Sequence, residues 1–219
     1  MNLYVVVEGE KTEPAVYKHW IRYVNPSLHY VDRIDEVVNN NFYIISGMGY
    51  PFYLQVIDDA IEDVNSNHNF DRLVISVDSE DLTYRDKRLE IEAHIAPKGC
   101  KIPIYIIIQH FCLETWALAN KSIIGRNIEN EALLEYANFY NVFDDDPEGL
   151  PTYKGMNRSQ FALKYLKKAI NEKSPRITYS KSNPEVILNN TYFNKVRKRY
   201  FDSTHIRSFN DFLLAFRKV

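Results

Sequence analysis

The chain has 219 residues, of which 45% are hydrophobic and 26% are charged, as is usual for a soluble globular protein. No apolar run is long enough to cross a membrane, and the N-terminus lacks the pattern of a signal peptide, so we expect a cytoplasmic protein. The two cysteines, Cys100 and Cys112, are too few for a disulfide framework.

The charges are distributed unevenly along the chain. Residues 1–150 contain 25 acidic and 12 basic side chains, whereas residues 151–219 contain 4 acidic and 15 basic side chains. An acidic body with a basic tail favours metal ions at one end and a polyanion at the other. Basic residues on solvated helix faces would give the same count, so the asymmetry alone does not decide between these interpretations.

The first half of the chain alternates between apolar, strand-like runs and helical patterns. Strands are predicted at 3–7, 42–45, 72–77 and 101–108, with an ambiguous segment at 28–38, and helices at 14–24, 51–64 and 84–96. This alternation predicts an α/β fold with a parallel, Rossmann-like sheet flanked by helices and right-handed crossovers.

The strand signal fades after residue 120. Helices are predicted at 129–139, 159–170, 189–200 and 209–217. Ser159 is expected to cap the second of these helices, and Ser208 with Asp211 resembles a capping box for the last one. We therefore expect a domain at 1–120 and a mainly helical, basic C-terminal region at 121–219 packed on it.

An acidic turn follows the first predicted strand, Leu3–Val7. It reads Glu8-Gly9-Glu10-Lys11-Thr12-Glu13, and Pro14 comes next. Gly9 allows the backbone to turn at once, Thr12 or Glu13 can cap a helix, and Pro14 suits its first position. Taken alone, this turn is more typical of a solvated acidic loop than of a site.

A second acidic cluster changes that interpretation, because Asp78, Glu80 and Asp81 follow the strand at 72–77. The carboxyl ends of parallel strands share one edge of a sheet, so Glu8 and Asp78 are expected to converge there. Asp78 and Glu80 are two residues apart and leave the strand with the same side-chain parity. Crowded carboxylates repel one another unless a cation neutralises them, and hard oxygen ligands favour Mg²⁺ or Mn²⁺.

Glu8-Gly9 after one strand and Asp78-x-Glu80 after another resemble the Toprim domain of topoisomerases, primases and OLD-family nucleases. The stretch from Glu8 to Pro14, with Tyr17, and the segment Phe111–Leu118 are similar to its RloB-like branch. The resemblance covers roughly residues 1–120. It departs from the family at Glu80, where an Asp is typical.

By this resemblance, Glu8 is a metal ligand or general acid/base, and Asp78 and Glu80 are metal ligands in a catalytic site. Glu13 would help to hold a second metal, and Asp81 is an alternative to Glu80. Glu114 either completes the site or caps its helix through its charge.

The resemblance implies a Mg²⁺- or Mn²⁺-dependent nuclease that cleaves DNA or RNA, tRNA included, in prokaryotic antiviral defence. A separate ABC- or AAA-type ATPase is implied as a partner, because the chain lacks an ATP-binding loop of its own. Whether the chain forms a homo-oligomer stays open. The best nucleic-acid footprint is made by Lys195, Arg197, Lys198 and Arg199, next to aromatic residues that either stack on bases or pack in the core.

Two other functions are weighed against this one. The first is a Toprim-like module that binds nucleic acid or protein without catalysis, which the Glu80 departure favours. The second is a small-molecule phosphotransferase or phosphatase with Asp78 as nucleophile. The loop Ser46–Gly49 is expected to be a turn, and a phosphate-binding loop only in second place. A zinc site of His94, Cys100, His110 and Cys112 is disfavoured because the spacing fits no compact pattern.

Overall fold

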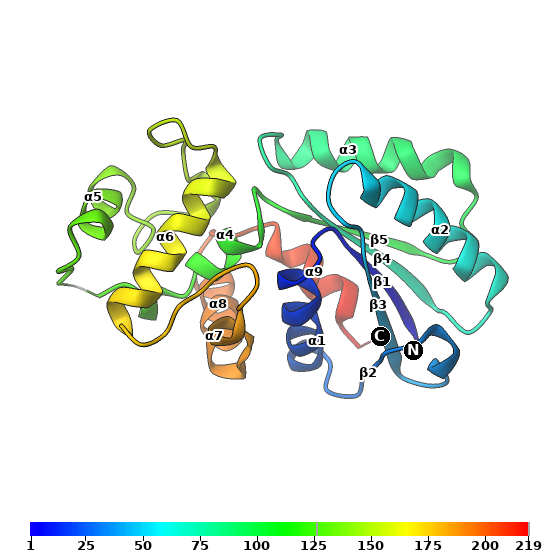
Figure 1. Ribbon diagram of the computed structural model, residues 1–219. Helices are drawn as coiled ribbons and strands as arrows, with labels where there is room; N and C mark the ends of the chain where they lie inside the picture. The colour runs from blue at the N-terminus through cyan, green and yellow to red at the C-terminus, as the bar shows by residue number, and fades with distance from the viewer. Residues whose placement is uncertain (126, 219) are drawn as a thin grey trace. The chain divides into compact units, whose positions relative to one another are not determined.

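A computed structural model describes residues 1–125 and 127–218, which divide into two compact units (Figure 1). The first unit consists of Met1–Val77, Thr83–Ile108 and Asp211–Val219, and the second of Asp78–Leu82 and Gln109–Asn210. The chain thus passes from one unit to the other several times. Arg126 and Val219, which fall in the predicted C-terminal region, lie outside the described residues.

A sheet of five parallel strands forms the centre of the first unit, in the order β2-β3-β1-β4-β5. The strands are β1 (Leu3–Val7), β2 (His29–Val31), β3 (Asn41–Ser46), β4 (Arg72–Asp78) and β5 (Ile104–Gln109). The predicted α/β fold with a Rossmann-like parallel sheet is confirmed. β5 begins three residues later than predicted, after Pro103, which has no backbone N–H to offer a neighbouring strand.

Helices cover both faces of this sheet. They are α1 (Thr12–Val24), α2 (Phe52–Ser66), α3 (Tyr84–Ile95) and the later part of α9 (Phe209–Phe216). Figure 1 shows α2 and α3 over one face and α1 and α9 over the other. All of β1 is buried, as expected for a strand covered on both sides. Tyr4 and Val6 join the core that includes Ile57 of α2, whereas Tyr17 of α1 contacts Phe212 of α9, with ring centroids 5.1 Å apart.

The start of α1 differs from the prediction. The helix begins at Thr12, with Lys11 as its N-cap residue, so Pro14 is its third residue and not its first. The first N–H groups of any helix have no partner within it, so a proline at the third position removes no helical hydrogen bond.

The second unit is mainly helical, as predicted for the C-terminal region, but its limits differ from the predicted 121–219: it includes Asp78–Leu82, begins again at Gln109 and ends at Asn210. It contains α4 (Leu113–Leu118), α5 (Glu131–Phe139), α6 (Arg158–Lys173), α7 (Glu185–Leu188), α8 (Asn190–Asp202) and the first residues of α9. Asn157 caps α6 in a capping box with Gln160, whereas Ser159, the predicted cap, donates its hydroxyl to the carbonyl of Phe111 at 3.1 Å. Within the described part of the chain, none of the helices has the length and apolar character needed to span a membrane.

Candidate functional site

The strand order places a topological switch point between β1 and β4. The connection that leaves β1 runs toward β2 and β3, whereas the connection that leaves β4 runs to β5. The two strands pair in parallel with Val7 opposite Ser76, so Glu8 directly follows one strand and Asp78 is the last residue of its neighbour. In open α/β sheets, ligands bind outside the carboxyl ends of strands at such a point.

The turn after β1 is held in place by its own backbone. The amide of Glu8 donates to the carbonyl of Ser76 at 3.0 Å, and the carbonyl of Glu8 accepts from the amide of Gly49 at 3.0 Å. Glu8 is half-buried, whereas Glu10 and Lys11 are exposed.

Gly9 gives room to a neighbouring side chain, which differs from the role that the sequence suggests for it. Its φ does not lie in the left-handed region; instead, a Cβ atom at this position would lie 1.9 Å from Oε2 of Glu13. Glu13 is only 7% exposed, so its carboxylate lies against the Gly9 backbone. The structure therefore brings Glu8 and Glu13 to the same turn.

The loop Ser46–Gly49 is a structural turn. The amides of Gly47 and Gly49 donate to the carbonyls of Val7 and Glu8, at 2.6 and 3.0 Å. The amide of Met48 donates to Oγ of Ser46 at 3.2 Å. Because these amides already have protein acceptors, the geometry supports the turn that was predicted first and not the phosphate loop.

A buried lysine near this turn was missed by sequence reasoning. Lys87 of α3 is 6% exposed, its Nζ donates to the Tyr53 hydroxyl at 3.2 Å, and it lies 3.1 Å from the Glu90 carboxylate. Burial raises the pKa of Tyr53, and the charges of Glu90 and Glu8 raise it further. The sequence signal for its burial was its position four residues before Ile91, because residues four apart lie on the same face of a helix and Ile91 is buried.

The segment after β4 is fixed by Ser79 and by the backbone of Glu80, whose amide donates to the Phe111 carbonyl at 3.0 Å. The Ser79 amide donates to the Gln109 carbonyl at 3.0 Å, and its hydroxyl accepts from the amide of Phe111 at 2.9 Å. Glu80 is exposed and has a φ of 50°, in the left-handed region that a non-glycine residue seldom adopts. The strand alternation that was expected to give Asp78 and Glu80 the same parity therefore ends at Asp78. Asp81 is also exposed.

Glu114 is buried in the second unit at 1% exposure and accepts a hydrogen bond of 2.9 Å from the Tyr179 hydroxyl. Burial raises the pKa of the neighbouring Cys112 thiol, and the charges of Glu114 and Asp78 raise it further. The charges of Asp78 and Glu114 therefore both raise the pKa of the same thiol. Sequence patterns gave no indication that Tyr179 is the hydrogen-bond donor to Glu114.

The basic residues of α8 have separate roles. Lys195, Arg197 and Lys198 are exposed, whereas Arg199 is 4% exposed. The guanidinium of Arg199 donates to the carbonyls of Val142 and Asp145 at 2.7 and 2.6 Å, which holds the loop after α5 against α8. Of the aromatic residues around them, Tyr192 and Phe193 pack in the core, and Phe201 is 68% exposed.

Among residues 1–125 and 127–218, no three His, Cys, Asp or Glu side chains are grouped as a metal site. His94 instead lies 2.8 Å from the Asp58 carboxylate, and His110 lies 3.0 Å from the Ser79 hydroxyl. Compared with protein-family models, with curated proteins and with solved structures, the chain has no match in any of the three.

Proposed function

We propose that this protein is a Toprim-type nuclease that hydrolyses phosphodiester bonds in DNA or RNA with the help of Mg²⁺ or Mn²⁺. One observation carries the proposal: neighbouring parallel strands, β1 and β4, end at the switch point of the sheet, and each is completed by a carboxylate, Glu8 or Asp78.

The donors have the chemistry that such a metal requires. Glu8, Asp78 and Glu80 supply hard oxygen ligands. Two further carboxylates are buried: Glu13, in the first acidic segment, and Glu114, on α4 outside both acidic segments. The described side chains form no ready group of three ligands, and mutual repulsion keeps carboxylates apart until a cation neutralises them. When bound, the metal would polarise a phosphoryl oxygen and lower the pKa of an attacking water.

The chain's own residues would then bind and orient the substrate and move protons. Glu8 either ligates the metal or accepts a proton from the water. The exposed Lys195, Arg197 and Lys198 are the candidates for contacts with phosphates, since Arg199 is engaged with backbone carbonyls. We extend the proposal to antiviral defence in the cytoplasm with a separate ATPase as partner, on the basis of the Toprim resemblance.

The test compares cleavage of plasmid, single-stranded DNA and tRNA by wild type, Glu8→Gln and Asp78→Asn, with Mg²⁺, Mn²⁺ or a chelator. Glu10→Gln is the matched control, because it makes the same change two residues away on an exposed side chain. We expect both site variants to lose about 10²–10⁴-fold in rate and the control to keep its rate. Equal activity in all four proteins would refute the proposal. Metal-independent binding without cleavage would instead identify a non-catalytic module.

A further inference from the structure

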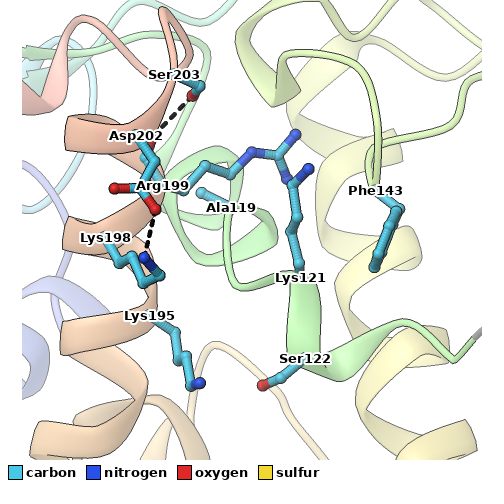
Figure 2. Close-up of a pocket in the computed structure, with 9 residues that line it drawn as sticks. All are labelled: Ala119, Lys121, Ser122, Phe143, Lys195, Lys198, Arg199, Asp202 and Ser203. Atoms are coloured by element: carbon cyan, nitrogen blue, oxygen red, sulfur yellow. Dashed lines mark hydrogen bonds and ion pairs between the residues drawn. The ribbon is translucent and has the colours of Figure 1, made fainter.

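The second unit contains a pocket of about 440 Å³ whose walls carry an excess of positive charge. Figure 2 shows side chains of α8 on one side and residues after α4 and α5 on the other. Four of the residues that line it are basic and one is acidic: Lys121, Lys195, Lys198 and Arg199, with Asp202. A volume of several hundred Å³ is that of a small-molecule site.

Two of the four cations in this pocket have no carboxylate partner among the described residues, whereas the charges of Asp144, Asp145 and Asp146 act on Arg199. Asp202 pairs with Lys198, at 2.5 Å, whereas Lys121 and Lys195 form no ion pair with any residue that the structure describes. Figure 2 shows the ends of Lys121 and Arg199 pointing toward one another. Like charges repel at short distance, and an anion between them would relieve this repulsion.

Arg199 supplies a cation that is already fixed in position. Its guanidinium is held by the carbonyls of Val142 and Asp145, so little of its side-chain freedom remains to be lost when a ligand binds. Burial lowers the pKa of the neighbouring His205 and the Arg199 charge lowers it further; Asp146 acts in the opposite direction, and Lys121 adds a smaller lowering effect. Arg199 and Lys121 therefore both influence the same side chain, His205.

An aromatic ring forms another wall of the pocket. Phe143 lines it, and Nζ of Lys121 lies 5.0 Å from the centroid of this ring. A ligand that suits these walls carries a phosphate for the cations and a flat, apolar surface for the ring.

We propose that this pocket binds a nucleoside phosphate, with the phosphate at Lys121 and Lys195, beside the fixed charge of Arg199, and the base against Phe143. A free nucleotide and the 5′-phosphorylated end of a nucleic acid share this chemistry. The proposal goes beyond the nuclease function and stands whether or not Glu8 and Asp78 support cleavage.

Isothermal titration of the full chain with AMP tests the proposal, and pyrophosphate and adenosine serve as partial ligands. Because base stacking on a single ring tolerates every base, AMP, GMP, CMP and UMP should bind within about tenfold of one another. Pyrophosphate, which lacks the base but carries more negative charge than AMP, should bind through the cations alone, and adenosine should not bind detectably. Failure of AMP to bind at millimolar concentration would overturn the proposal.

Three variants separate the phosphate contacts from the ring contact. Lys121→Gln combined with Lys195→Gln should weaken AMP binding tenfold or more, because charge-assisted hydrogen bonds are lost. Phe143→Leu should weaken AMP binding about tenfold and leave pyrophosphate unchanged. Lys167→Gln is the matched control, an exposed cation on α6 of the same unit that does not line the pocket.

Equal affinity for AMP in wild type and the double variant, or no effect of Phe143→Leu, would overturn the proposal. Thermal melting of each variant checks that it is folded. Competition then identifies the source of the ligand. Displacement of AMP by a 5′-phosphorylated oligonucleotide, and not by its 5′-hydroxyl form, indicates a nucleic-acid end, whereas displacement by neither oligonucleotide indicates a free nucleotide.

Discussion

The carboxylate of Glu148 should make the second unit less stable as the pH rises through neutrality. Glu148 accepts a hydrogen bond of 3.1 Å from the amide of Ser208 and a shorter one from the Ser208 hydroxyl. The same hydroxyl accepts from Nε1 of the buried Trp116 at 2.7 Å. Burial raises the pKa of Glu148 to about 7, although its bonds with Ser208 act in the opposite direction.

The sign and size of the effect follow from proton linkage. Because the pKa in the folded state lies above the ordinary value of 4.5, the folded protein holds a proton that the unfolded chain has released. The contribution of Glu148 is fully present below pH 4.5 and is lost as the pH rises through 7. The shift corresponds to about 3 kcal/mol of unfolding free energy.

Urea unfolding of wild type and Glu148→Gln at several pH values between 5 and 8 measures this contribution. The chain has two tryptophans, Trp20 and Trp116, and a Trp20→Phe background leaves only the one that belongs to the second unit. Burial lowers the pKa of His110, which gives a pH dependence of the opposite sign, so the difference between wild type and variant is the quantity to follow.

We expect the stability of wild type relative to Glu148→Gln to fall by about 2.5 kcal/mol as the pH rises from 5 to 8. Glu131→Gln, which changes an exposed carboxylate of the same unit, should keep the wild-type pH dependence. A Glu148→Gln profile parallel to that of wild type would refute the reasoning, because the titrating group would then lie elsewhere.

Two further substitutions test contacts that hold each unit together. Arg199→Met should destabilise the second unit by about 3 kcal/mol, because the carbonyls of Val142 and Asp145 lose a charged donor. Trp116 fluorescence during urea unfolding measures this loss of stability, and a change below about 1 kcal/mol would contradict the prediction. Gly9→Ala should destabilise the first unit by about 1–3 kcal/mol, because the new Cβ displaces the Glu13 carboxylate. Trp20 fluorescence during urea unfolding measures this loss of stability, and a variant as stable as wild type would show that Glu13 moves freely.

Much of the fold could be predicted from the sequence because its signals are local. The apolar run Leu3–Val7 corresponds to a strand with the same limits, and alternation of strands with helices predicts a parallel sheet. The errors lie at element ends. Ser159 matched the local preference for a helix cap, but its hydroxyl bonds to Phe111, which is distant in the sequence. No periodic pattern contains that contact.

The candidate site was less predictable because side-chain placement depends on packing between distant segments. The ends of β1 and β4 were correctly placed on one sheet edge from strand patterns alone. The exposure and left-handed conformation of Glu80, by contrast, accompany hydrogen bonds of Ser79 and of the Glu80 amide to Gln109 and Phe111, which are distant in the sequence. The burial of Arg199 likewise depends on carbonyls more than fifty positions away, so a count of charges on one helix could not reveal it.

The return of α9 to the first unit has a consequence for folding during synthesis on the ribosome. Phe212 and Phe216 pack on Tyr17, and Phe212 also contacts Trp20, so this face of the sheet is covered by residues translated near the end of the sequence given. While residues 109–210 emerge and fold, Tyr17 and Trp20 remain without this cover. A nascent chain halted before Phe212 should therefore expose aromatic surface that chaperones recognise.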